Sequence, residues 1–389
     1  MNVDQIRGEI SGHVDDFLFA GSDADSEWQS ILKRIQEKFK WGDWEDTNFT
    51  QCGVQIRQTD EGFELSQAQY LESVSEIPVN ASRRKEKQSP ITEQERSRLR
   101  TLLGAVSWHA QQVAPQWSAE VSLLLSEVAQ GTVETIVKSN ILLSRAKAQR
   151  GHIMKIHRHE TDDLVMFAWV DAANQNRADG GSTQGIFIGM GPRAVLEGEV
   201  GAISPVAWHS NRIDRVCRSP GAAETQAAVN GEDALFFARY QWAEMLHGSK
   251  LVRQPNRLVS KVPGCLVTDS RNVYDKLQTE VLTVKGAEKK SNLELLGLKE
   301  SQQQTQVAIR WVHSEAQLGN SLTKSGGNKE IEMFYSMGHR WRIVEDEQMR
   351  SARKRKADGV EPLQNQTSPS QHKPHDNTHE NPFPTGELG

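Results

Sequence analysis

Two apolar runs in the second half of the chain each end at an aspartate, and this pattern constrains the fold most. Residues 165–170 (VMFAWV) end at Asp171, and residues 265–268 (CLVT) end at Asp269. Short apolar runs of this length are typical of buried strands. A carboxylate at the end of such a strand is costly to bury unless it is paired or bound to a cation. We therefore expect a sheet whose strand ends carry a cation site.

A third carboxylate, Glu224, opens a long helical pattern between the two runs. Ser219 suits the N-cap of this helix, and Pro220 suits its first position. Glu224 leads a stripe at helical spacing that faces the core, where a lone carboxylate would be desolvated. The alternative is that Glu224 lies at the wet rim and interacts with the helix N-terminus. Together with Asp171 and Asp269, it predicts a site for Mg²⁺ or Mn²⁺, which prefer hard oxygen ligands.

The apolar periodicity changes from helical to strand-like at residue 164. The expected elements are strands at 164–171, 185–190, 194–200 and 204–210, a helix from Pro220, a strand at 265–269, a helix from about Asn272, a strand at 307–312 and a final helix around 316–324. Joining the strands before Pro220 into a three-strand meander gives the order βββαβαβα. This order predicts an α/β domain over residues 161–345.

The first 160 residues divide into a strand-rich part and a helical part. Residues 10–21 predict two short strands with Asp15 and Asp16 at the turn, and a plain polar turn is the alternative reading. The other expectations are a helix over 27–39, a hairpin over 49–56 extended by a strand at 63–65, a helix capped by Ser66, an exposed loop over 80–92 and helices filling 93–148. The fold class is therefore mixed, α+β followed by α/β.

Charge is distributed unevenly along the 389 residues, whose net charge is −5. Residues 1–80 carry 6 Lys+Arg and 16 Asp+Glu, a net −10, whereas residues 81–160 carry 13 and 7, a net +6. The basic excess marks a place where a nucleic-acid duplex could cross, and ordinary variation among solvated helices explains it equally well. No apolar run of about 18 residues predicts a membrane span.

Localisation signals are few. The N-terminus has no signal-peptide pattern, and three scattered cysteines form no disulfide framework, which favours a cytoplasmic or nuclear protein. Residues 350–356 hold five Lys and Arg, and residues 362–389 hold five prolines. We expect disorder over 346–389, with the basic run directing nuclear import, binding nucleic acid or simply lying in solvent.

Several motifs carry a resemblance to a known family. Residues 13–16 (HVDD) look like the Tyr-x-Asp-Asp motif of a reverse-transcriptase palm, and residues 99–108 (LRTLLGAVSW) look like a connection signature. Four further motifs follow in the order found in a ribonuclease H domain: WVDAA, SPGAAET, VTDSR and WVHSEAQLGNSLTK. The chain thus resembles the C-terminal part of the Pol polyprotein of copia-type LTR retrotransposons.

The resemblance implies a domain plan and an activity. It implies a truncated palm (1–79), a helical thumb or connection (80–160), a ribonuclease H-like domain (161–345) and a basic, Pro-rich tail (346–389). The implied activity is metal-dependent hydrolysis of RNA in RNA–DNA hybrids. Polymerase activity is not expected, because the fingers and the third polymerase carboxylate are missing, and another chain would have to supply the fingers.

The resemblance also assigns roles to single residues. Asp171, Glu224 and Asp269 match the metal ligands, and Asp15 and Asp16 match a remnant of the polymerase site. A separate departure concerns the family's fourth carboxylate, whose position is occupied by Asn320. An asparagine offers only a neutral carbonyl ligand. The alternative function is therefore a catalytically dead relic that at most binds nucleic acid.

Overall fold

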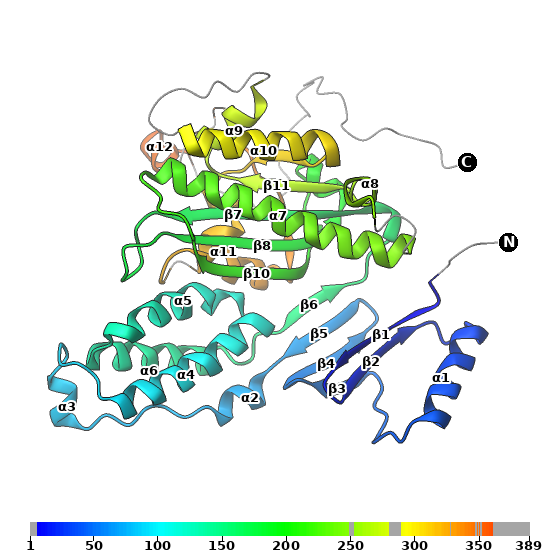
Figure 1. Cartoon of the computed structure of the whole chain (residues 1–389), viewed down its shortest axis with the longest axis horizontal. Helices are drawn as coiled ribbons and strands as arrows, with labels where there is room; N and C mark the ends of the chain where they lie inside the picture. Colours follow the sequence, from blue (N-terminus) through cyan, green and yellow to red (C-terminus); the bar gives the residue numbers. More distant parts are fainter. Residues whose placement is uncertain are drawn as a thin grey trace.

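The computed structural model describes residues 6–248, 253–279, 289–326, 328–346, 348, 350 and 352–360. The chain begins with a small hairpin unit, continues into a four-stranded sheet and a group of helices, and ends in a larger five-stranded sheet covered by further helices (Figure 1). No helix in these residues is long and apolar enough to cross a membrane.

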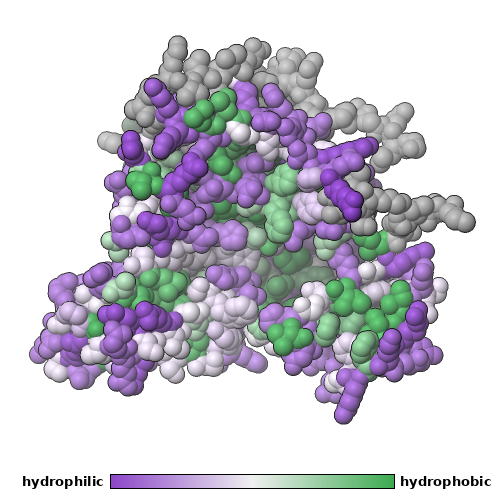
Figure 2. Space-filling model, viewed as in Figure 1, coloured by the Kyte–Doolittle hydropathy of each residue, from purple (hydrophilic) through white to green (hydrophobic). Residues whose placement is uncertain are grey.

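The N-terminal unit is an antiparallel hairpin packed on one helix. Its elements are β1 (Gly8–His13), β2 (Asp16–Gly21) and α1 (Ser26–Lys38). The side chain of Asp25 caps α1 by accepting from the backbone N–H groups of Glu27 and Trp28. The Trp28 ring lies on Gly8 and Gly21, where added Cβ atoms would be 2.5 and 2.3 Å from it. Figure 2 shows hydrophobic surface over this unit, and Phe17 and Phe39 are among its exposed residues.

The second sheet has the antiparallel order β3-β4-β5-β6. Its strands are β3 (Asn48–Gln51), β4 (Val54–Thr59), β5 (Gly62–Ser66) and β6 (Met154–His157). The three strands expected over 49–65 are confirmed. Strand β6 was not predicted, because four residues are too short to show a period and their partner, β5, lies about 90 residues earlier in the chain. Ser66 was wrongly predicted as a helix cap. It ends β5, and Gln67 occupies the cap position.

Helices fill residues 93–148, as predicted. The helical elements of this part are α2 (Ala68–Ser73), α3 (Ala81–Lys85), α4 (Glu93–Gln112), η1 (Pro115–Trp117), α5 (Ser118–Glu127), η2 (Val128–Gln130) and α6 (Val133–Ala148). The expected loop over 80–92 is wrong in part. Asn80 caps the short helix α3, and Arg83 in that helix is held by ion pairs with Glu86 and Glu95.

The larger sheet has the order β10-β8-β7-β11-β12. Its part of the chain contains β7 (Leu164–Ala173), β8 (Thr183–Pro192), β10 (Ser204–Arg212), α7 (Pro220–His247), α8 (Pro255–Val259), β11 (Gly264–Thr268), α9 (Arg271–Gln278), α10 (Lys289–Thr305) and β12 (Ala308–Trp311). Strands β7, β8 and β10 are antiparallel neighbours, while β11 and β12 run parallel to β7. A mixed α/β fold is thus confirmed. The arrangement differs in detail from the predicted order βββαβαβ, because α8 and α10 are added before β12.

Side chains of β7 alternate between two cores. Phe167 and Trp169 join a cluster shared with the helices α4 to α6, whereas Met166, Ala168 and Val170 pack with α7. The indole of Trp208 on β10 also donates to the carbonyl of Ala110 on α4 at 2.8 Å. The helical part is therefore packed against the larger sheet through a common core.

Two expectations near the sheet are wrong. The strand expected at 194–200 is the 3-10 helix η4 (Arg193–Glu197), which Gly198 ends with a left-handed φ of 84°. Only β9 (Gly201–Ala202) follows, and it pairs with β13 (Arg340–Trp341). The final helix expected around 316–324 is instead two 3-10 turns, η6 (Ser314–Ala316) and η7 (Leu318–Leu322), followed by the unpredicted helix α11 (Lys329–Ser336).

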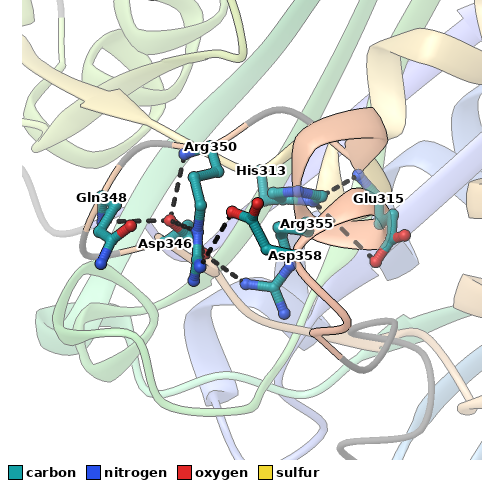
Figure 3. Close-up of polar contacts among 7 residues, drawn as sticks. All are labelled: His313, Glu315, Asp346, Gln348, Arg350, Arg355 and Asp358. Carbon is teal, nitrogen blue, oxygen red and sulfur yellow. Dashed lines mark hydrogen bonds and ion pairs between the residues drawn. The ribbon is translucent and has the colours of Figure 1, made fainter.

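The expected disorder from residue 346 is also wrong for the residues that the structure describes. Residues Ala352–Ala357 form α12, and Arg355 donates to the buried carboxylate of Asp346 at 2.6 Å (Figure 3). Arg350 donates to the same carboxylate at 2.9 Å. Burial opposes ionisation of Asp346, but these hydrogen bonds hold its pKa well below the ordinary value. Residues 361–389 lie outside the described residues.

Candidate metal centre

The structure brings Asp171, Glu224 and Asp269 together. Asp171 lies two residues before the end of β7, Asp269 directly follows β11, and Glu224 lies near the start of α7. One carboxylate oxygen from each lies within 4.8 Å of the others. β7 and β11 are parallel neighbours, so their carboxyl ends meet at one edge of the sheet. The side chain of Ser219 accepts from Ala222 N–H and Pro220 is the first helical residue, which places Glu224 over that edge.

The electrostatics of this cluster disfavour three negative charges. Burial, together with the neighbouring carboxylates Asp171 and Asp269, raises the pKa of Glu224 to about 10. Burial and Asp171 raise the pKa of Asp269 to about 7, although a hydrogen bond from Ser314 acts in the opposite direction. Burial also raises the pKa of Asp171. Without a cation, the site therefore favours protonated carboxyl groups.

Glu224 is the carboxylate of the cluster with an oxygen that has no hydrogen-bond donor. Its Oε2 atom is buried and receives no hydrogen bond from the described residues. The expectation that Glu224 faces the core thus fits the structure better than the alternative at a wet rim. A buried carboxylate oxygen without a donor is suited to a cation, because such an oxygen can only accept.

Gln317 joins the two strand ends that carry the aspartates. Its side-chain amide is fully buried and donates to the carbonyls of Val170 at 3.1 Å and Val267 at 3.2 Å. Its Oε1 accepts from Gly319 N–H at 3.1 Å. Gly319 itself lies so close to β7 that a Cβ there would be 3.0 Å from the Asp171 nitrogen. Sequence reasoning missed Gln317, because an isolated glutamine has no pattern that marks it as buried.

Asn320 lies beside two residues that contact the carboxylates. Its amide donates to the Ser314 carbonyl at 2.7 Å. The hydroxyl of Ser314 hydrogen-bonds to Asp269, and the hydroxyl of Thr323 lies 2.5 Å from Asp171 Oδ2 and 3.0 Å from the Asn320 carbonyl. Asn320 therefore belongs to the segment that borders the cluster.

Lys324, a further residue that sequence reasoning missed, supplies positive charge at the cluster. It is exposed, and its ammonium group lowers the pKa of all three carboxyl groups against the effect of burial. The residue follows Thr323 in the motif LTK, but a single lysine in a polar segment gives no sign of its target. The cluster is thus acidic, and the ammonium group of Lys324 lies at its border.

Asp15 and Asp16 lie far from this arrangement in the fold. They occupy the tip of the β1–β2 hairpin, where His13 pairs with Asp16, and both are exposed. Among the described residues, only Asp171, Glu224 and Asp269 form a group of three acidic, His or Cys side chains close enough to share a metal ion. The structure therefore does not complete a polymerase-type carboxylate set at the hairpin.

Comparisons with known proteins find similarity in solved structures alone. No family model matches the chain, and no curated protein sequence matches it. It is similar to a foamy viral protease-reverse transcriptase in complex with an RNA/DNA hybrid, at 15% identity over 78% of this chain and 36% of that chain, with a TM-score of 0.44. It is also similar to the foamy viral protein in complex with dsDNA, at 14% identity over 78% of this chain and 55% of that chain, with a TM-score of 0.40.

Nearly the whole of a smaller protein also matches part of this chain. RNase H1 from the halophilic archaeon Halobacterium salinarum has 15% identity, with 43% of this chain and 98% of that chain covered and a TM-score of 0.27. The chain spans 36% and 55% of the length of the two foamy viral chains that it matches.

Proposed function

We propose that this chain carries a divalent-metal-dependent nuclease that hydrolyses the RNA strand of RNA–DNA hybrids, in a ribonuclease H-like domain over residues 161–345. The observation that carries the proposal is the convergence of Asp171, Glu224 and Asp269, with Glu224 Oε2 buried and unbonded. The strand and helix order up to β12 supports the same domain. The choice of substrate rests on the sequence motifs that resemble a retrotransposon ribonuclease H.

The donor set fits Mg²⁺ or Mn²⁺. All three side chains offer hard carboxylate oxygens, and no thiol or imidazole joins them in the described cluster. A bound divalent ion would activate water and stabilise charge on the phosphate. The chain's own residues hold the ligands. Gln317 fixes the two strand ends that carry Asp171 and Asp269, and α7 delivers Glu224 from the opposite side.

Proton release should accompany loading of this site. The pKa values of Glu224 and Asp269 are raised to about 10 and about 7, so both carboxyl groups compete with the cation for protons. We therefore expect cation affinity and cleavage to increase as the pH rises above about 6. Equal cation affinity at pH 6 and pH 8 would contradict this account of the cluster.

The remaining modules are proposed by resemblance: a palm remnant over 1–79 and a helical connection over 80–160. Strand β6 qualifies this division, because residues 154–157 pair with β5 of the palm remnant. Asp15 and Asp16 lack a third ligand among the described residues, so we expect no primer extension by this chain alone. Primer extension that Asp15→Asn abolishes would contradict that expectation.

The direct test is cleavage of a labelled RNA–DNA hybrid by the purified full chain, with single-stranded RNA and double-stranded DNA as comparison substrates. Cleavage should need Mg²⁺ or Mn²⁺, and Asp269→Asn should remove it. Asp275→Asn is the matched control, since Asp275 lies on the next helix and pairs with exposed Arg271. Cleavage that persists in Asp269→Asn at the wild-type rate would overturn the proposal.

A second candidate function, nucleic-acid binding without cleavage, is favoured by Asn320. Because an asparagine side chain is neutral, the fourth position of the motif contributes no negative charge. Its amide instead donates to the Ser314 carbonyl. If this loss limits cleavage, Asn320→Asp should raise the rate about tenfold, which equals about 1.4 kcal/mol of transition-state stabilisation. Residual wild-type activity should then prefer Mn²⁺ to the strictly octahedral Mg²⁺. An unchanged rate would show that Asn320 only orders its 3-10 turn.

A further inference from the structure

The loop between β7 and β8 reaches from the acidic cluster to the helical part of the protein. Arg177 in this loop donates to Ser122 on α5 twice, to its carbonyl at 3.0 Å and to its hydroxyl at 3.1 Å. A third contact, at 3.4 Å, joins the guanidinium to the Thr183 hydroxyl. Arg177 is half-buried, and this burial lowers the pKa of its guanidinium group. One side chain thus fixes the loop to both α5 and β8.

The residue before it, Asn176, continues this chain of hydrogen bonds toward the carboxylates. Its amide nitrogen donates to the Thr323 carbonyl at 2.8 Å, and its Oδ1 accepts from the Thr183 hydroxyl at 2.8 Å. Thr183 is fully buried. Because both ends of the Asn176 amide are bonded, its orientation is set, and so is the backbone at Thr323.

Thr323 makes the last contact, with the candidate metal ligand itself. Its hydroxyl oxygen lies 2.5 Å from Asp171 Oδ2. An ionised carboxylate can only accept, so a hydroxyl at this distance must donate to it whenever Asp171 is charged. The Thr323 methyl side is packed closely, since a Cβ on Gly185 of β8 would lie 2.9 Å from Thr323 Cγ2. This packing holds the Thr323 side chain in one rotamer, in which Asp171 Oδ2 is the nearer of the hydroxyl's two acceptors and the Asn320 carbonyl, at 3.0 Å, is the other.

We propose that Thr323 is a positioning residue for cation binding by Asp171, and that Arg177 and Asn176 tie it to α5 so that docking of the helical part sets the cation affinity of the cluster. The inference rests on the proposed function for the existence of a cation site. It adds a dependence of that site on a helix that contributes no ligand.

The test measures Mn²⁺ binding to the full chain by electron paramagnetic resonance, without nucleic acid. Thr323→Val removes the hydroxyl with little change in shape, and Mn²⁺ should bind about tenfold more weakly. Thr323→Ser keeps the hydroxyl and should bind within about twofold of wild type. Arg177→Met cuts the link to α5 one step earlier and should weaken binding about threefold.

Gln149→Ala is the matched control. Gln149 follows α6 and donates to Glu332 on α11 at 3.2 Å, so it also joins the helical part to the sheet domain, but among the described residues no chain of hydrogen bonds leads from it to the carboxylates. Its Mn²⁺ affinity should equal that of wild type. Thermal unfolding of each variant without metal ensures that folded protein is compared.

The nuclease proposal and the positioning proposal can fail separately, because wild-type cleavage tests the first and Mn²⁺ binding by the variants tests the second. If wild type binds Mn²⁺ and Thr323→Val and Arg177→Met bind equally well, the positioning role is overturned and the nuclease proposal stands. If wild type binds Mn²⁺ but cleaves no hybrid, the nuclease proposal fails while the variants still decide the positioning role. If wild type binds no Mn²⁺, the cation site is refuted, and the positioning role is refuted with it.

Discussion

Neutralising Glu224 should stabilise the metal-free protein while abolishing its response to metal. In the variant Glu224→Gln, the side chain keeps its size but cannot ionise. The wild-type carboxyl is buried, has an unbonded Oε2 and lies beside Asp171 and Asp269, and these features raise its pKa from 4.5 to about 10. At pH 8 this group is ionised in the unfolded chain. In the folded chain it must either bind a proton or remain a buried charge, and both lower the free energy of unfolding.

The size of the effect follows from proton linkage. At pH 8 the group lies about 3.5 pH units above its ordinary pKa of 4.5, and one unit corresponds to about 1.36 kcal/mol, so the cost is about 5 kcal/mol. The glutamine amide is also buried without a full set of partners, which offsets about 1–3 kcal/mol of the gain. The net stabilisation should be about 2–4 kcal/mol, or roughly 6–12 °C in melting temperature.

The assay is thermal unfolding at pH 8 with chelator and then with increasing Mn²⁺. Wild type should melt lower than Glu224→Gln in chelator and should be stabilised by Mn²⁺, because a ligand that binds the folded state alone raises stability. Glu224→Gln should show little response to Mn²⁺. The control is Glu232→Gln on the same helix, whose carboxyl is also buried but accepts from Ser301 at 2.5 Å, and which should keep the wild-type response. A lower metal-free melting temperature for Glu224→Gln, or a retained Mn²⁺ response, would refute the reasoning.

Three further predictions concern stability. Gln317→Leu leaves the carbonyls of Val170 and Val267 without their buried donor and should reduce the free energy of unfolding by about 3 kcal/mol in urea titration. A loss below about 0.5 kcal/mol would contradict the role of Gln317 in joining the two strand ends. Burial lowers the pKa of His339 to about 3, so the unfolded chain takes up a proton that the folded chain refuses. Stability should therefore fall as the pH drops from about 6.5 to about 3, and His339→Phe should flatten this decline in a series of thermal melts. Asp346→Asn removes the carboxylate that binds Arg355 and should therefore speed amide hydrogen exchange in α12. Exchange at the wild-type rate would disprove this prediction.

Part of this architecture could be predicted from local pattern alone. The apolar runs before Asp171 and Asp269 identify two buried strands, and Ser219 with Pro220 identifies the start of α7. These signals lie in consecutive residues, because strand periodicity and helix capping depend on neighbours in the chain. The three acidic side chains could therefore be named from the sequence, and the structure brings those same three together.

Other features depended on which distant segments meet. Strand β6 exists because β5 offers it an edge, and residues 316–324 form 3-10 turns because Gly319 must lie against the backbone of β7. Gln317, Thr323 and Arg177 carry no local pattern that marks their roles. Each acquires its role only when folding places a carbonyl, a carboxylate or a second helix within hydrogen-bond distance of it. The sequence by itself identified the candidate ligands, and tertiary packing decided what holds them, since hydrogen bonds between distant residues form only where the fold brings donor and acceptor together.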